Sequence, residues 1–323
     1  MKLTKLLLVL TALGLSACGS TPASSSQSSS SESAPDTSKI KIIAPSGAPT
    51  LAFYNKIDQL TTSSATATVR SQLQTNDYDV VVFDFKTGLD DIKNSNGTSN
   101  YKLARILTAG NLVLVGINNK EEPKEGDKIV SFGKNLLPDL AFNELYGNSG
   151  AEVSYVDGGV QNVAPVLKSK KYQGEPVDYV VIAEPLLTST LAGVEDPENY
   201  TQFSIREKWE EVKGNGHIIP QAGLFINMNS YQNNEKVYNE FLKELDSDIS
   251  NGLTDPTLIK TAFESVGDVE AQKEKFGIPA NMAFKVTKTN NGCGLVSEYN
   301  KLALTNFFAD INQSFESYKD YVL

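Results

Sequence analysis

Residues 103–117 read LARILTAGNLVLVGI, and this stretch decides the fold that we expect. It is apolar towards both ends but carries Thr108, Gly110 and Asn111 in the middle. We interpret it as a strand that leaves one β-sheet and enters a second. Because buried polar groups need hydrogen-bond partners, Thr108 and Asn111 indicate contact with a ligand or a hinge hydrogen bond at the crossing point.

Strand, loop and helix patterns repeat on both sides of this crossing. Residues 39–44 form an apolar strand that breaks at a Gly/Pro loop, and a helix begins near Thr50. The continuous apolar run 78–83 is typical of a parallel strand buried on both faces. Beyond the crossing, we expect strands at residues 128–132, 152–156 and 177–183 and a helix at residues 136–146. Such repeats predict open, mainly parallel sheets.

The chain is expected to return to the first sheet through the apolar strand 222–227. The remainder is mainly helical and ends in a helix whose apolar side chains run from Tyr299 to Phe315. The sequence thus predicts an α/β protein with two independently packed lobes, each a mainly parallel sheet flanked by helices. Lobe one comprises residues 39–111 and 223–323, and lobe two is inserted as residues 112–222. Two crossing strands between lobes form a hinge.

The N-terminus has the pattern of a secretory signal. Lys2 and Lys5 precede the apolar run 6–15, which is too short to span a bilayer. The run ends in LSAC, which is similar to a bacterial lipobox. We therefore expect residues 1–17 to be a signal peptide and Cys18 to carry acyl chains such as palmitate; the alternative is an ordinary signal with a chance cysteine. The Ser-rich segment 18–38 predicts a flexible tether to the outer face of a bacterial cell membrane.

Composition excludes several classes of function. The chain has 39 acidic and 29 basic residues, a net charge of −10, and no basic cluster, so nucleic acid is not an expected partner. His217 is the one histidine, and Cys293 is the one cysteine left after Cys18. We therefore predict no metal site, no cofactor and no catalytic residue. Cys293 is expected to be a small buried residue, Trp209 a partly buried core residue, and His217 a surface loop residue.

The candidate ligand site follows from the strand ends, because ligands of open α/β sheets bind beyond the carboxyl ends of the strands. Loops that precede helices also present free N–H groups, which suit anions or carbonyl oxygens. These rules select Ser46, Gly47, Ala48, Pro49, Thr50, Phe83, Asp84, Phe85, Thr108, Asn111, Ser131, Gly133, Lys134, Asn135, Asp157, Gly158 and Glu184 as ligand-binding candidates.

Some of these candidates have a structural alternative. Phe83 and Phe85 alternate around Asp84, so the two rings face the side opposite to the carboxylate and could both be core residues. Glu184, which precedes Pro185, could cap the next helix instead of facing a cleft. The glycines after the strands could be plain turns.

Five segments carry a resemblance to a known family: residues 44–49 (APSGAP), 78–82 (YDVVV), 109–114 (AGNLVL), 183–185 (AEP) and 221–224 (QAGL). In their order and spacing, the chain is similar to the substrate-binding lipoproteins of ABC transporters for nitrate, sulfonates, taurine and thiamine-pyrimidine precursors. The resemblance covers about residues 39–315 and implies a two-lobe periplasmic binding protein fold of type II. It also implies capture of a small solute between the lobes, for delivery to a permease and ATPase complex.

The sequence departs from this family at the loop 131–135 (SFGKN), which is not a tight Gly–Ser turn. The cysteine cluster of related pyrimidine-synthesising enzymes is also absent, which argues against that activity. We expect a monomer whose ligand is an aromatic or heterocyclic solute, or a small anion. Arg70 and Arg105 are candidate anion contacts only if they point inward.

Two other functions stay open. One is a surface-anchored enzyme acting through carboxylates such as Asp84, Asp157 or Glu184, which would need two acids converging on one substrate. The other is a ligand-sensing or adhesive domain on the same fold.

Overall fold

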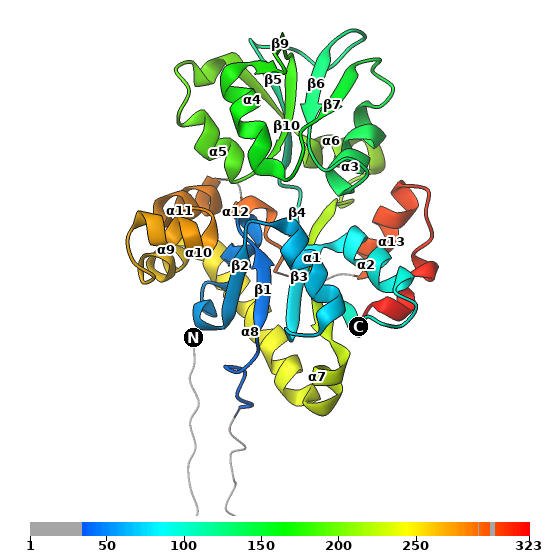
Figure 1. Cartoon of the computed structure of the whole chain (residues 1–323), viewed down its shortest axis with the longest axis vertical. Helices are drawn as coiled ribbons and strands as arrows, with labels where there is room; N and C mark the ends of the chain where they lie inside the picture. Colours follow the sequence, from blue (N-terminus) through cyan, green and yellow to red (C-terminus); the bar gives the residue numbers. More distant parts are fainter. Residues whose placement is uncertain (1–33, 290, 298–300) are drawn as a thin grey trace, which may run out of the picture. The chain divides into compact units, whose positions relative to one another are not determined.

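The computed structural model describes residues 34–289, 291–297 and 301–323 (Figure 1). The expected signal peptide, the lipidation site Cys18, the tether up to residue 33 and Tyr299 lie outside these residues. Within the described part, the strands form two five-stranded sheets and one short hairpin. No helix of this part is both long and apolar enough to cross a membrane.

Sheet A has the strand order β2-β1-β3-β12-β4. β1 is parallel to β2 and β3, whereas β12 is antiparallel to β3 and β4. The strands comprise Ile42–Pro45 (β1), Leu60–Ser63 (β2), Val80–Asp84 (β3), Tyr101–Ala109 (β4) and Pro220–Asn227 (β12). The chain leaves sheet A after β4 and rejoins it with β12.

Sheet B has the order β11-β5-β10-β6-β7 and repeats this plan, because β10, β6 and β7 are parallel while β5 is antiparallel to β10 and β11. Its strands comprise Leu112–Ile117 (β5), Lys128–Ser131 (β6), Glu152–Tyr155 (β7), Tyr179–Ala183 (β10) and Tyr200–Ser204 (β11), and a hairpin pairs Lys171–Tyr172 (β8) with Glu175–Pro176 (β9). The predicted α/β fold with two sheets is confirmed. In each sheet four strands run in one direction, and one strand, β12 in sheet A and β5 in sheet B, runs against them.

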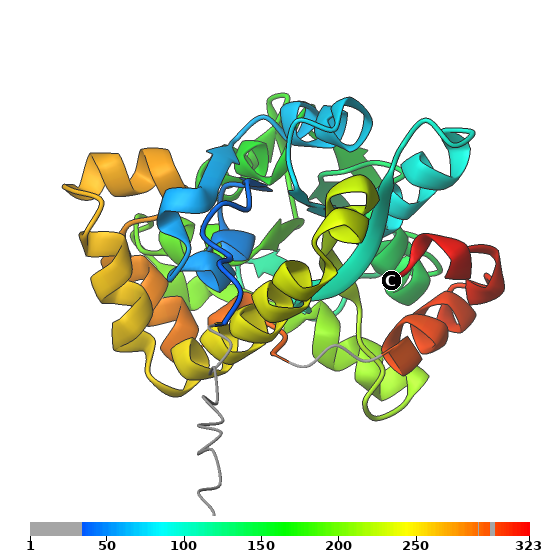
Figure 2. The same cartoon turned by 90° about the horizontal axis from the view of Figure 1, so that it is seen from below.

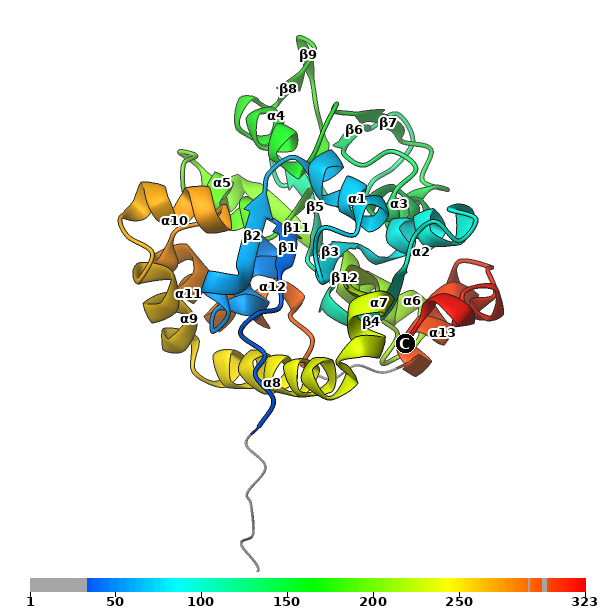
Figure 3. The same cartoon turned by 60° about the horizontal axis from the view of Figure 1, so that its bottom comes forward.

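Helices flank both sheets. Figures 2 and 3 show α8 lying between the group α9–α11 on one side and α2 and α13 on the other. The helices near sheet A comprise Ala48–Phe53 (η1), Ile57–Gln59 (η2), Thr66–Thr75 (α1), Phe85–Asn94 (α2), Met228–Asn233 (α7), Glu235–Thr254 (α8), Pro256–Glu264 (α9), Val269–Phe276 (α10), Ala280–Thr289 (α11), Asn291–Gly294 (α12), Lys301–Asp310 (α13), Phe315–Ser317 (η5) and Lys319–Tyr321 (η6). Those of sheet B comprise Leu137–Tyr146 (α3), Val160–Val163 (η3), Ala164–Ser169 (α4), Leu186–Leu191 (α5), Pro197–Asn199 (η4) and Ile205–Lys213 (α6).

The apolar run 78–83 is buried on both faces of sheet A, as predicted. Val80 and Val82 join a cluster formed with α8–α11, whereas Val81 and Phe83 join the cluster on the opposite face. Successive strand residues point to opposite faces, so a strand covered on both sides needs apolar residues throughout. The run 103–117 is divided between the sheets, because β4 ends at Ala109 and β5 begins at Leu112. The lobe boundaries at residues 111/112 and 222/223 stay a prediction.

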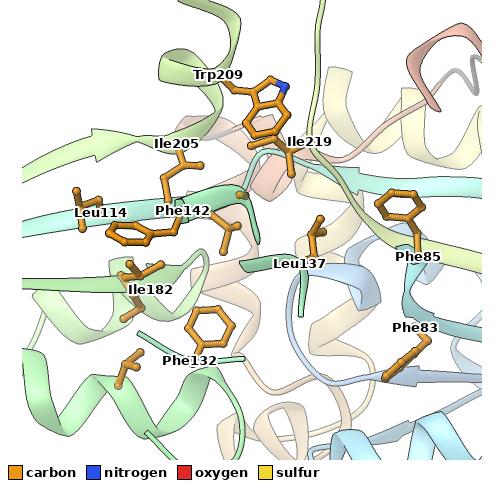
Figure 4. Close-up of a cluster of buried hydrophobic side chains, with 14 of the residues drawn as sticks. Phe83, Phe85, Leu114, Phe132, Leu137, Phe142, Ile182, Ile205, Trp209 and Ile219 are labelled. Atoms are coloured by element: carbon orange, nitrogen blue, oxygen red, sulfur yellow. The ribbon is translucent and has the colours of Figure 1, made fainter. Parts of the chain in front are cut away.

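One face of sheet A has a cluster of its own, but its other face shares a core with sheet B, and the expectation of two independently packed lobes is wrong in this respect. One hydrophobic cluster runs from the Val81 face of sheet A into sheet B. It passes through Phe85, Phe307 and Trp209 (Figure 4 shows Phe85 and Trp209). Phe307 meets Phe85 edge-on at 5.2 Å between ring centroids and stacks on Trp209 at 5.9 Å. Trp209, expected to be partly buried, has no exposed surface.

The substitution Phe307→Ala is expected to lower the free energy of unfolding by about 3–5 kcal/mol, because it removes a fully buried ring that joins the cores of both sheets. Urea denaturation followed by circular dichroism measures the change. Val212→Ala, at a side chain that is 54% exposed on α6, is the control and should change it by less than about 0.5 kcal/mol. Equal effects of the two substitutions would contradict the central place of Phe307.

Candidate functional site

The predicted site lies where strand ends of both sheets approach the crossing point of the chain. β1 and β3 of sheet A end at Pro45 and Asp84. In sheet B, β6, β7 and β10 end at Ser131, Tyr155 and Ala183. Two hollows, of about 540 and 570 Å³, lie elsewhere: one is lined by residues 38–41, 58, 59, 61, 72, 77 and 78, the other by α8, α9 and α11. No predicted site residue lines either of them.

The loop after β1 is held by the last residue of α10. The Gly47 N–H donates to the Phe276 carbonyl at 2.8 Å, and Gly47 has a left-handed φ of 108°. The hydroxyl of Thr50, a fully buried residue, donates to the Gly47 carbonyl at 2.7 Å. The helix expected near Thr50 is a six-residue 3₁₀ helix starting at Ala48, which is buried too. Ser46, Gly47 and Pro49 are the half-buried residues of this loop.

The end of β3 presents one carboxylate. Asp84 caps α2, because its Oδ1 accepts a hydrogen bond from the Thr87 N–H at 2.8 Å. Burial raises the pKa of Asp84, and the hydrogen bonds from Thr87 oppose that rise. Phe83 and Phe85 both belong to the cluster that joins the sheets, so the structure places these two rings in the core. Both rings are therefore core residues, which was the structural alternative to a ligand contact, and they lie on the same face of the sheet as predicted.

Thr108, Asn111 and Glu184 form the hinge hydrogen bonds. The Thr108 hydroxyl accepts from the Ala222 N–H of β12 at 3.1 Å. The Asn111 N–H donates to the Gln221 side-chain carbonyl at 2.7 Å. Two further hydrogen bonds join Asn111 and Glu184. The Glu184 N–H donates to the Asn111 backbone carbonyl at 2.9 Å, and the Asn111 Nδ2 donates to the Glu184 backbone carbonyl at 3.3 Å. Thr108 and Asn111 thus have hydrogen-bond partners at the crossing point, and their contact with a ligand stays a prediction.

The Glu184 carboxylate is directed to the following helix. Its two oxygens accept from the Thr188 N–H at 3.0 Å and from the Thr188 hydroxyl at 2.8 Å. Glu184 is 8% exposed, so the helix-cap alternative describes these contacts. Cys293, at 1% exposure, is buried as expected, and burial raises the pKa of its thiol.

Arg206 is a residue that the sequence interpretation missed. Gly110 has a left-handed φ of 79°, and a Cβ there would lie 2.4–2.8 Å from the Arg206 side-chain carbons. The arginine therefore lies across the crossing backbone, which only glycine permits. β11 ends at Ser204, which pairs with Val113 near the start of β5, so α6 begins at the same edge of sheet B. Within the described part of the chain, the Arg206 guanidinium has no hydrogen bond or ion pair.

The two arginines named from the sequence are already paired. Arg70 forms two hydrogen bonds of 2.7 Å with Asp91, and Arg105 contacts Asp246 at 3.2 Å. A bidentate carboxylate partner occupies the donors that an anionic ligand would need. Arg206 could have been selected as a candidate because it closely follows the end of a strand, but that strand, β11, was not predicted from the sequence.

The loop after β6 is organised by Asp139, a second residue that was missed. The Asp139 carboxylate accepts from the Asn135 N–H at 2.7 Å, the Asn143 side chain at 2.6 Å and the Tyr155 hydroxyl at 2.5 Å. Ser131 is fully buried at the start of this loop. Burial and the bond to Asp139 raise the pKa of Tyr155 to about 12.

The candidates of sheet B are brought together at one edge. β6 and β7 are parallel, with Ser131 opposite Tyr155, so the loops after them are neighbours. Gly133, Lys134 and Asn135 come from the first loop, and the exposed Asp157 and Gly158 come from the second. The Lys134 ammonium lies 5.4 Å from the centre of the Tyr155 ring. The described residues contain no group of three or more His, Cys, Asp or Glu side chains that could hold a metal ion.

No protein-family model and no curated protein matches the chain. Solved structures do. An ABC transporter structure from Parabacteroides distasonis has a TM-score of 0.63 at 15% identity and covers 89% of this chain and 96% of its own. The periplasmic aliphatic sulphonate binding protein from Escherichia coli has a TM-score of 0.57 at 10% identity, covering 87% and 93%.

A third structure, from Candida albicans, is described as having the generic periplasmic binding protein fold; its TM-score is 0.52 at 12% identity, covering 85% and 89%. The chain has a periplasmic binding protein fold. The resemblance inferred from the five sequence segments is thereby confirmed at the level of the fold. In this fold, the hinge bonds of Asn111 lie between the sheets, and the loops after β1, β3, β6 and β7 are the candidate ligand contacts.

The substitution Asp84→Asn is expected to raise the free energy of unfolding at pH 7. Burial raises the folded-state pKa of Asp84 above its ordinary value of 3.8. As the pH rises from 3.8 through the folded-state pKa, ionisation of Asp84 therefore lowers the free energy of unfolding. Asparagine has no charge to bury, and its Oδ1 still accepts from the Thr87 N–H. The gain should shrink as the pH falls towards 3.8 and vanish below it.

Urea unfolding at a series of pH values from 7 downwards measures this difference. Asp157→Asn, at an exposed side chain, is the matched control and should show no such trend. A variant of Asp84 that is less stable than the wild type at pH 7, or equally stable at every pH, would contradict a destabilising carboxylate.

Proposed function

We propose that the protein is the extracytoplasmic solute-binding component of an ABC importer. The observation that carries this proposal is the convergence of strand ends from both sheets at one crossing point, tied by the Asn111 bonds to Gln221 and Glu184. A ligand that contacts the loops of both sheets stabilises their closed arrangement by its differential affinity. Similarity in fold to an aliphatic sulphonate binding protein and an ABC transporter structure supports the same function.

In this proposal, lobe one comprises residues 39–111 and 223–323, and lobe two comprises residues 112–222. The protein acts as a monomer. The carboxylate-enzyme alternative has less support, because Glu184 is occupied as a helix cap and Asp157 lies exposed on a surface loop. The three acids of that alternative, Asp84, Asp157 and Glu184, therefore do not share one partner.

The ligand we propose is a small solute with an anionic group. Arg206 supplies a cation without a carboxylate partner in the described part of the chain, and the exposed Lys134 supplies another at the loop after β6. A flat aromatic ligand was favoured by four rings near the strand ends, and all four are buried: Phe53, Tyr54, Phe83 and Phe85. Ser46 and Asp84 offer polar atoms from sheet A.

A screen of small anions tests the function directly. Calorimetry with ethanesulfonate, taurine, nitrate and phosphate, and with neutral heterocycles for comparison, is expected to find saturable binding of one molecule per chain. Small-angle X-ray scattering should show compaction on binding. Arg206→Gln should weaken binding about tenfold or more, since a charge-assisted bidentate contact is lost. Arg70→Gln, which breaks a surface pair with Asp91, is the control and should leave affinity unchanged. Failure of every compound to bind or compact the protein would overturn the solute-binding function.

The second part of the proposal is a lipid anchor at Cys18. Expressed in a bacterium, the full chain should fractionate with membranes, and Cys18→Ala should move it to the soluble extracytoplasmic fraction, because the acyl chains and not the acidic body hold it there. Ser26→Thr, in the Ser-rich segment and outside the LSAC signal, serves as the control. Equal release of both variants and the wild type would favour the ordinary-signal alternative.

A further inference from the structure

The C-terminal helix α13 is attached to sheet A by aromatic contacts. Phe307 meets Phe85, the first residue of α2, edge-on at 5.2 Å, and Phe308 stacks on Tyr318 at 4.7 Å. The Tyr318 hydroxyl donates to Asp90 of α2 at 2.7 Å. Beyond it, the Leu323 N–H donates to the Leu103 carbonyl of β4 at 2.8 Å. The segment from α13 to the C-terminus is therefore fixed to sheet A along α2 and the edge strand β4.

The other side of α13 is attached to α6, which follows β11 of sheet B. Trp209 of α6 stacks on Phe307 with 22° between the ring planes. The Trp209 Nε1–H donates to Asp310 Oδ2 at 3.2 Å, and His217 Nδ1 lies 2.8 Å from the same oxygen. The Lys213 ammonium donates to the Asp310 carbonyl at 3.1 Å. All three partners of Asp310 come from α6 and the loop between it and β12. We name this set the Asp310 socket.

The socket is a specific contact and not general packing. The Asp310 side chain is 9% exposed, and a carboxylate with so little access to water is costly unless it is hydrogen-bonded. Its partners satisfy it only while α13 stays in register with α6. His217, expected to be a plain surface residue, is three residues before Pro220, where β12 begins and pairs with Ala109. The socket therefore holds α13 against the very segment that returns from sheet B to sheet A.

These contacts alter the mechanics expected of a two-strand hinge. A rotation between the sheets that leaves α13 with α2 must break the Asp310 socket and the stacking of Trp209 on Phe307. A rotation that keeps the contacts of α13 with both α2 and α6 is confined to an axis that passes close to α13. Packed contacts of this kind have discrete arrangements and do not deform continuously.

We propose that α13 is a third connection between the lobes and that Asp310 is a positioning residue, whose socket sets the balance between open and closed lobes. The proposal rests on the solute-binding function, since the balance between open and closed lobes matters only if a ligand binds. That balance changes ligand affinity even though Asp310 does not contact the ligand. The contacts that carry it are those of α13 with α2 and α6, and they do not depend on any ligand.

Distance measurement between the lobes tests the proposal. Spin labels at Thr68 on α1 and Lys168 on α4, both exposed, report the separation by double electron–electron resonance in the full chain with Cys18→Ser and Cys293→Ala. The wild type is expected to give one main distance. Asp310→Asn should raise the population at other distances about fivefold or more, because the charged acceptor of the Trp209 N–H, which also contacts His217 Nδ1, is lost. Asp320→Asn, an exposed acid in the same terminal segment, is the matched control and should leave the distribution unchanged.

Trp209→Phe removes the N–H donor and part of the ring system while keeping one aromatic ring beside Phe307, and it decides the matter if Asp310→Asn does not fold. A structural role alone would lower the melting temperature without moving the label distance. Unchanged distances in the folded variant or variants would overturn the proposal. The measurement uses no ligand, so a failed ligand screen would overturn the solute-binding function and leave this result standing.

Discussion

The arrangement of both sheets depends on the short step between β4 and β5. Gly110 takes a left-handed backbone conformation with Arg206 across it, and Asn111 then bonds to Gln221 on one side and Glu184 on the other. Gln221 belongs to β12 and Glu184 directly follows β10, so Asn111 joins the outgoing chain to the returning chain and to the end of β10. A substitution at Gly110 would meet both a strained φ and a steric conflict with Arg206.

The core imposes a second constraint on the same region. Because one hydrophobic cluster runs through Phe85, Phe307 and Trp209, the sheets share buried surface beside the crossing. Buried aromatic rings pack at near-crystalline density and resist gradual displacement. Motion between the sheets must therefore conserve this contact or exchange it for another of similar quality. A hinge of two bare strands would face no such condition.

The sequence predicted the parts of the fold that burial dictates on its own. The runs 78–83 and 103–117 were recognisable because a strand covered on both faces has no polar alternation. β2 and β11 were missed because they are short edge strands, LTTS and YTQFS, with polar residues and no continuous apolar run. The faces of Phe83 and Phe85 were predicted from alternation, but their place in the core depends on α13, which lies more than 200 residues further along the chain. Arg206 and Asp139 gained their roles from tertiary neighbours that no local pattern specifies.

The loops themselves restrict how a ligand could be recognised. Free N–H groups at helix starts were the basis for an anion site, yet the Gly47 N–H is bound to the Phe276 carbonyl and the Asn135 N–H to Asp139. A donor that already has a good acceptor gains little from a ligand, since exchange of one hydrogen bond for another is nearly neutral. Under the solute-binding function that we propose, recognition then falls to side chains. Asp84, whose pKa burial raises, and Arg206, which lies at the crossing, would contribute opposite charges from the two sheets. Closure that brings those two charges to one solute would favour a molecule with a donor at one end and an anionic group at the other.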